Sequence, residues 1–136
     1  MPKITHEQVM AATDHLVAAF AATDTDAYFA CFSADATFVF HPEPARLDDR
    51  ATYERLWASW LDEGWRVVSC ASTERLVQIL GDAAVLSHTV DTVVSVDGQQ
   101  SISRERESIV FALDGEHVPP RLLAVHEHLS PVPEPS

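Results

Sequence analysis

The sequence predicts an α+β domain in which a curved antiparallel sheet wraps around three N-terminal helices, cone-shaped with an internal pocket. Apolar residues recur at helical spacing in the first half, whereas the second half consists of long aliphatic and β-branched runs between turn signals. These strand candidates leave no room for helices between them, so we expect mainly antiparallel pairing. Long strands twist and curl, so helices on the concave face would leave a cone-shaped space.

Length and composition fit one domain. The chain has 136 residues, of which 46% are hydrophobic, and this suffices for a buried core without a metal or disulfide. We expect a single α+β domain over residues 1–130, followed by a proline-rich tail over residues 131–136.

The charge balance excludes some partners. Nine Lys and Arg against 21 Asp and Glu give a net charge of −12, which repels nucleic acid and anionic membrane surfaces. No stretch has the length and apolarity of a signal peptide or membrane span, and two cysteines make no disulfide framework, so we expect a cytoplasmic protein.

Three helices are predicted in the first half. Thr5 and Gln8 form a capping box. The apolar stripe that follows comprises Val9, Ala12, Leu16 and Phe20. A brief second helix is predicted over residues 27–32, and a third over residues 51–62, ended by Gly64.

Six strands are predicted. The first spans residues 37–40, after a turn at 33–35, and prolines at 42 and 44 end it. The others span residues 65–72, 76–80, 83–96, 101–113 and 121–129. Asp97-Gly98, between two long runs, is a strong hairpin signal.

The last strand carries the most informative pattern. His126 and His128 share one face, while the opposite face holds Glu127 among three aliphatic residues and is interpreted as the packing face. The histidine face is then solvent or pocket. Two imidazoles so spaced could act as general acid and base, chelate a metal, or simply be satisfied by polar neighbours. No third ligand motif stands near, so we expect no metal.

Arginines alternate in the preceding strand. Arg104 and Arg106 share a face, and Arg106 in particular could hold a carboxylate or enolate oxygen. Cross-strand ion pairs with glutamates such as Glu105 and Glu107 are the plainer alternative.

Other candidates are aromatic or isolated. His88 lies among apolar residues and is either a buried, hydrogen-bonded histidine or a pocket residue. Aromatic residues at helical spacing form core or a ligand platform. The candidate ligand-binding aromatics are Tyr28, Phe40, Tyr53, Trp57 and Trp60. No glycine-rich phosphate loop and no Gly-x-Ser-x-Gly elbow occurs, so no cofactor is expected.

Several strings resemble the nuclear transport factor 2-like superfamily, and within it the SnoaL-like group of small bacterial proteins. They are Phe32-Ser33-Ala34-Asp35-Ala36-Thr37, Gly81-Asp82-Ala83-Ala84-Val85, Arg106-Glu107-Ser108 and Val125-His126-Glu127-His128-Leu129-Ser130. The resemblance implies a curved sheet around helices, an apolar cavity and a homodimer. It also implies varied functions, from polyketide cyclases, ketosteroid isomerases and dehydratases to the association domain of calcium/calmodulin-dependent kinase.

The sequence departs from the isomerases of this superfamily. Leu16 stands where the isomerase has its first-helix tyrosine, and Phe40 or His41 where it has its basic aspartate. Of these, only His41 could move a proton.

The expected function is the binding of a small, largely apolar molecule with an anionic or carbonyl group. If the protein is an enzyme, we expect proton transfer or cyclisation on that molecule. His126, His128 or His41 would act as acid or base, and Arg106 would hold the oxygen. The alternative is a non-catalytic ligand-binding or assembly domain.

Overall fold

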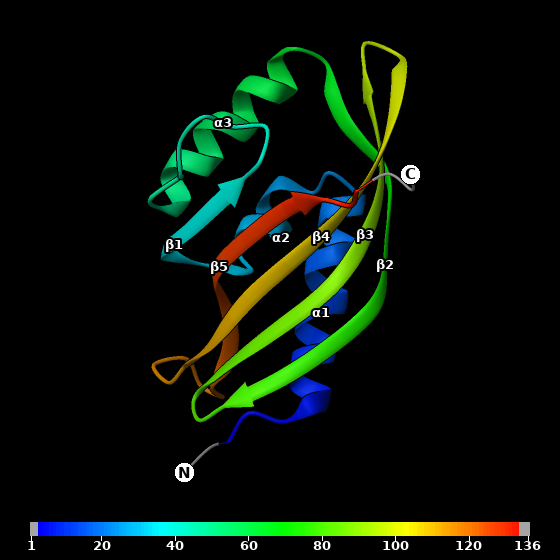
Figure 1. Ribbon diagram of the computed structural model, residues 1–136. Coiled ribbons are helices and arrows are strands. Elements are labelled where there is room, and N and C mark those ends of the chain that lie inside the picture. Colours follow the sequence, from blue (N-terminus) through cyan, green and yellow to red (C-terminus); the bar gives the residue numbers. More distant parts are fainter. Residues whose placement is uncertain (1–2, 134–136) are drawn as a thin grey trace.

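The computed structural model describes residues 3–133, and Figure 1 shows its helices gathered behind one curved sheet. The elements follow in the order α1 (His6–Ala21), α2 (Thr25–Phe29), β1 (Phe32–Phe40), α3 (Arg50–Asp62), β2 (Trp65–Leu80), β3 (Ala83–Val96), β4 (Gln99–Asp114) and β5 (Arg121–Pro131). The predicted α+β class, with three N-terminal helices and a curved antiparallel sheet, is confirmed. Residues 134–136 of the predicted tail lie outside the described residues.

Each helix begins at a side chain that accepts from free backbone N–H groups. Thr5 and Gln8 form the predicted capping box, because Gln8 N donates to Thr5 Oγ1 at 3.1 Å and Thr5 N donates to Gln8 Oε1 at 2.8 Å. Asp24 caps α2 and Asp49 caps α3 in the same way.

The five strands lie in the order β1-β5-β4-β3-β2. Strands β2 to β5 pair antiparallel with their sequence neighbours, while β1 pairs parallel to β5 at the edge. The twist of such long strands curls the sheet, which gives it a concave and a convex face.

Three predicted boundaries were wrong. The second helix, predicted over residues 27–32, is α2 at Thr25–Phe29. β1 begins at Phe32, so residues 33–35 lie in a strand and not in a turn. The two strands predicted over 65–72 and 76–80 are the single strand β2, whose register shifts between Thr73 and Leu76. Glu74 there has φ 55°, the backbone of a bulge, which absorbs extra residues without ending the ladder.

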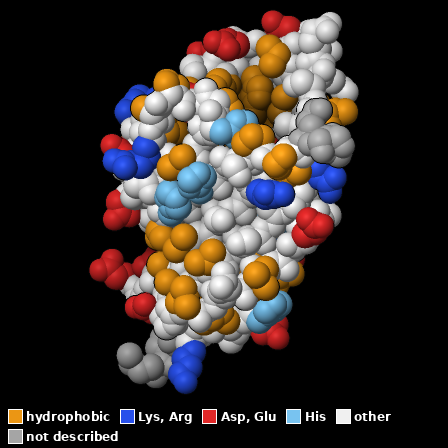
Figure 2. All heavy atoms as spheres, in the orientation of Figure 1, with side chains coloured by type: hydrophobic (Ala, Val, Ile, Leu, Met, Phe, Trp, Pro, Cys, Tyr) orange, Lys and Arg blue, Asp and Glu red, His pale blue; other side chains and the backbone are white. Residues whose placement is uncertain are grey.

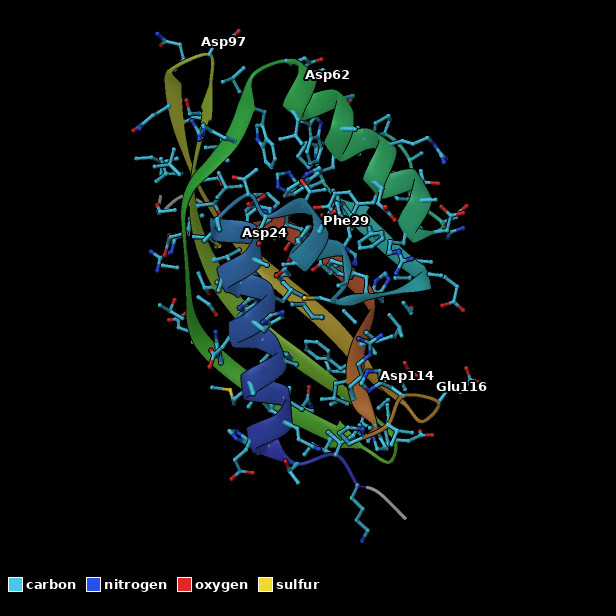
Figure 3. The ribbon with its side chains drawn as sticks, turned by 180° about the vertical axis from the view of Figure 1, so that it is seen from behind. Asp24, Phe29, Asp62, Asp97, Asp114 and Glu116 are labelled. Carbon is cyan, nitrogen blue, oxygen red and sulfur yellow. The ribbon has the colours of Figure 1, made fainter. Side chains whose placement is uncertain are left out.

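The core fills the concave side between the helices and the sheet, as the view from behind shows (Figure 3). Trp57 on α3 is 1% exposed, stacks on Tyr28 of α2 at 4.9 Å between ring centroids, and donates Nε1–H to Thr25 Oγ1. Phe38 of β1 meets Tyr53 edge-on at 4.7 Å. These aromatic contacts fix α2 and α3 over one end of the sheet.

The turn after α3 touches the β3–β4 hairpin. Gly64 has φ +85°, and Asp97 N donates to Gly64 O at 3.2 Å. Figure 3 places Asp62 and Asp97 at the same end of the molecule. A Cβ on Gly64 would lie 2.0 Å from Asp97 Oδ1, so only glycine fits without a shift.

Candidate active site

A cavity of about 290 Å³ lies between the helices and the concave face of the sheet. Its apolar walls include Leu16 and Phe20 of α1, Trp60 of α3, and Trp65, Val90 and Leu129 of the sheet. Strand alternation creates this interior, because every second residue of β2 to β5 points toward the helices. A largely apolar ligand would gain its affinity from these walls.

The charged side chains that line the cavity are all carboxylates: Glu43, Glu105, Glu107 and Glu127. Within residues 3–133, no Lys, Arg or His side chain belongs to the lining. Glu105 and Glu107 are two residues apart on β4 and so share its inner face. Because Ile109 pairs with Glu127 and Glu107 with Leu129, Glu107 and Glu127 stand at diagonal positions of neighbouring strands.

Glu127 is the most deeply buried of these acids. It is 1% exposed, and its Oε1 has no hydrogen-bond partner. Burial, and next the negative charge of Glu107, raise the pKa of Glu127 well above its usual range. This raised pKa favours the protonated form of Glu127, which has a proton to donate into the cavity.

Two tyrosines of the lining share a hydrogen bond. The hydroxyl oxygens of Tyr28 and Tyr53 lie 2.9 Å apart, and both residues are 2% exposed. Burial is the main cause that raises the pKa of both phenols, and the charge of Glu127 adds to it. Both hydroxyls thus stay protonated and can serve as hydrogen-bond donors.

Glu107 has a fixed partner. Its Oε1 lies 2.8 Å from His88 Nε2, and the His88 side chain is fully buried. The second ring nitrogen, Nδ1, lies 2.6 Å from Ser72 Oγ on β2. His88 therefore stands behind Glu107 and holds one of its oxygens, while Glu107 itself reaches the cavity.

His41 lies beside the cavity lining. Its Nε2 is 2.6 Å from Glu105 Oε2, and its side chain is 35% exposed. It follows β1 directly and precedes two lining residues, Pro42 and Glu43. The structure thus brings His41 next to the site through Glu105, and a catalytic role for it stays a prediction.

The expectation that His126 and His128 face the cavity was wrong. In the register of β5 with β4, they stand in one row with Arg106 on the convex face, which Figure 2 shows with its histidine side chains in pale blue. His126 Nδ1 lies 2.7 Å from Thr37 Oγ1. Partial burial, and next the neighbouring His128, lower the pKa of His126.

The prediction for the two histidines was wrong because it treated the aliphatic face of β5 as a packing face without a cavity. Glu127 and Leu129 face the helices, as predicted, but the cavity is on that same face. Near the start of β5 a register shift turns the strand over, so that Ala124 is buried in the core in place of Leu123. The sequence does bring Arg106, His126 and His128 together, around a shallow hollow on the outside of the sheet. This hollow is open to water, which screens the charges that line it.

The aromatic candidates divide into two sets. Tyr28, Phe40, Tyr53 and Trp60 line the cavity, and their part in binding stays a prediction. Trp57 belongs to the core instead, because rings of α1, α2 and β2 pack around it. His88 is a buried, hydrogen-bonded histidine, the first of its two predicted alternatives.

The glutamates are the functional residues that sequence reasoning missed. Glu127 interrupts three aliphatic residues on one strand face, and an acid in a buried row signals a functional or paired carboxyl. Glu105 and Glu107 alternate in the same phase as Ile109 and were interpreted only as ion-pair partners. Cys70 also lines the cavity, and burial raises the pKa of its thiol to about 11, so it offers no thiolate.

Within residues 3–133, no three His, Cys, Asp or Glu side chains are grouped as metal ligands. None of the helices in that range is long and apolar enough to cross a membrane.

Comparisons with known proteins agree on the architecture. An NTF2-like protein from Rhodospirillum rubrum superposes with a TM-score of 0.78 at 17% identity, over 92% of this chain and 98% of that one. A proposed dehydratase of the NTF2-like family from Streptomyces avermitilis gives 0.78 at 19%, over 94% and 96%. The CaMKII hub of S. rosetta gives 0.76 at 20%, over 97% and 100%. At these identities the likeness shows the fold alone.

The sequence itself identifies the family. No curated protein matches the chain. A family model described as the SnoaL-like domain matches residues 9–134, which include the helices from Val9 onward and the whole sheet. The chain therefore belongs to the SnoaL-like domain family.

Proposed function

We propose that the cavity binds a small, largely apolar, uncharged molecule with a carbonyl group and transfers a proton at the carbon beside it. One observation supports this most strongly: two neighbouring carboxyls differ in their surroundings, because Glu127 Oε1 is buried without a partner whereas Glu107 Oε1 is held by His88. Such a pair provides an acid and a base in one site. The proton transfer predicted for histidines is thus reassigned to glutamates.

The two glutamates would take different parts. Glu107, as the carboxylate, removes a proton from the carbon next to the carbonyl, and the electron pair moves onto the carbonyl oxygen. Glu127, as the acid, donates its proton to that oxygen and forms an enol, with the hydroxyl of the Tyr28–Tyr53 pair that keeps its hydrogen as a further donor. Glu107 then returns its proton to another carbon conjugated with the enol while the oxygen returns its proton to Glu127, which completes an isomerisation.

The charge of the cavity lining favours neutral ligands over anionic ones. Four carboxyl groups and no cation line the cavity within the described chain, so an anionic ligand has no counter-charge there. The anionic group allowed for by the sequence is therefore disfavoured, and a neutral carbonyl is retained. Arg106 cannot hold its oxygen, because that side chain lies on the other face of the sheet.

The test uses an apolar ketone, 2-acetylnaphthalene, in deuterated water. We expect the protein to accelerate exchange of its methyl protons, measured by NMR, and Glu107→Gln to abolish the acceleration. His126→Ala on the convex face is the matched control and should exchange like the parent protein. Equal exchange in Glu107→Gln and the parent would contradict the proposal, and binding without exchange would favour a non-catalytic binding protein.

A second candidate is self-association through the convex face, as a homodimer. Leu76, Leu80 and Ile102 are 59%, 63% and 80% exposed, and Figure 2 shows apolar side chains spread over this face. The similarity to a kinase hub, an association domain, supports it. Light scattering should give about twice 15.0 kDa, and Ile102→Lys should lower that mass. A parent protein that stays at 15.0 kDa at micromolar concentration would contradict the dimer.

A further inference from the structure

A row of hydrogen bonds runs from the cavity to the outside of α1 through three strands. It begins at Glu107 Oε1, which lies 2.8 Å from His88 Nε2, and continues from His88 Nδ1 to Ser72 Oγ at 2.6 Å. Arg75 Nε then donates to the same Ser72 oxygen at 2.8 Å, and Arg75 Nη1 to Asp14 Oδ1 at 2.6 Å.

The donors and acceptors in this row allow one placement of the hydrogens that runs without a break from Arg75 to Glu107. A guanidinium has donors and no acceptor, so Ser72 Oγ must accept from Arg75. The single hydroxyl hydrogen of Ser72 is then free to donate to His88 Nδ1. A neutral imidazole that accepts at Nδ1 carries its hydrogen on Nε2, so His88 donates to Glu107 Oε1.

The bulge in β2 makes this direction possible. It carries Arg75 out of the regular register and lets one guanidinium reach both Ser72 and α1. The Arg75 side chain is only 16% exposed, and the exposed carboxylate of Asp14 neutralises its outer end. Arg75, the donor at the outer end of the row, is therefore held in place.

We propose that Arg75 and Ser72 are positioning residues, which act through His88 to keep Glu107 a carboxylate that is ready to accept a proton. The purpose assigned to that carboxylate rests on the proposed function, whereas the placement of the hydrogens rests on the four distances alone. The row orients the Glu107 carboxylate but does not conduct protons, because a guanidinium does not give up its proton under ordinary conditions. It gives the two neighbouring glutamates opposite tasks: Glu127 donates and Glu107 accepts.

The first measurement is ¹⁵N NMR of the His88 ring in the parent protein at pH 7. We expect a neutral ring with its hydrogen on Nε2 and none on Nδ1, together with a Glu107 carboxyl ¹³C shift typical of a carboxylate. A hydrogen on Nδ1, or a protonated Glu107, would overturn the inference.

Variants of Ser72 show whether it positions the His88 ring or only stabilises the contact between α1 and the sheet. In Ser72→Ala, His88 Nδ1 loses its donor, so we expect part of the rings to gain a hydrogen on Nδ1. Ser72→Thr, which restores a hydroxyl, should return the parent spectrum, and Ser69→Ala on the same strand is the control. If Ser72→Ala only lowers stability in urea and leaves the ring unchanged, Ser72 is structural and the inference fails.

The ketone exchange experiment keeps the two proposals distinguishable. If the parent protein shows the expected His88 tautomer but no exchange, the proposed function fails and the positioning row stands. If exchange occurs while His88 carries its hydrogen on Nδ1, the row has been assigned wrongly and the proposed function stands.

Discussion

At the scale of single residues, Glu127 carries the largest electrostatic consequence. In the unfolded chain a glutamate loses its proton near pH 4.3, whereas burial keeps Glu127 protonated in the folded protein to a much higher pH. In that interval the folded state binds more protons than the unfolded state. Glu127 therefore favours folding most at low pH, and its contribution declines as the pH rises above about 4.3.

Glu127→Gln should remove this decline, because an amide of nearly the same shape does not titrate. We expect the free energy of unfolding of the variant, relative to the parent protein, to increase between pH 4 and pH 8. Urea unfolding at several pH values measures it. Glu116→Gln, in an exposed loop, is the control and should show no such trend. A constant difference across this range would mean that Glu127 is ionised in the folded protein.

The tyrosine pair is a second residue-scale test. Tyr28→Phe and Tyr53→Phe each remove one hydroxyl from a buried bond of 2.9 Å, and each should lower the free energy of unfolding by about 1–3 kcal/mol. The double variant should lose less than the sum, because the second substitution no longer leaves a partner unsatisfied. Urea unfolding of all four proteins measures this coupling. Strict additivity would show that the two hydroxyls do not interact in solution.

At the scale of elements, the sequence predicted what local chemistry determines. The capping box at Thr5, the stop after Phe40 and the hairpin at Gly98 each depend on neighbours in the chain, and each was found. The predicted strand boundaries were wrong where strand pairing determines them. The start of β1 at Phe32 and the continuity of β2 through its bulge depend on partner strands, which no local pattern contains.

The candidate site was predicted less well for the same reason. The alternation of side chains along the strand correctly placed Glu127 on the opposite face from His126 and His128. Only the curvature of the sheet determines which of the two faces encloses a cavity. The aromatic lining at Tyr28, Tyr53 and Trp60 could be predicted because large rings at helical spacing point inward in either interpretation.

The turn after α3 gives an element-scale prediction with a built-in control. Gly64 and Gly98 both have φ +85°, so alanine at either position should lower the free energy of unfolding by about 1–2 kcal/mol. At Gly64 the new Cβ also meets Asp97, whereas at Gly98 nothing lies within 4 Å. Asp97 Oδ1 is the end of an exposed side chain that can turn away, so Gly64→Ala should lose more than Gly98→Ala in urea unfolding, but by less than about 1 kcal/mol. Equal losses would show that the hairpin moves aside without cost.

At the scale of the whole molecule, the acidic cavity lies within a chain of net charge −12. We expect 2-acetylnaphthalene to bind and shift the indole NMR signals of Trp60 and Trp65, while 2-naphthoate, a carboxylate of similar shape, should bind at least about tenfold more weakly. A higher salt concentration should reduce the difference between the two affinities only in part, because the acids of the lining are shielded from solvent. Equal affinity for both probes would contradict a lining without counter-charge.

The lack of any positive side chain among the lining residues of the described chain also bears on turnover. A substance that leaves the reaction as an anion would be driven out toward the solvent, and a negative intermediate would be short-lived unless Glu127 gave up its proton to it. Rearrangements and losses of water, which begin and end with neutral molecules, suit such an enclosure better than reactions that must retain an anion.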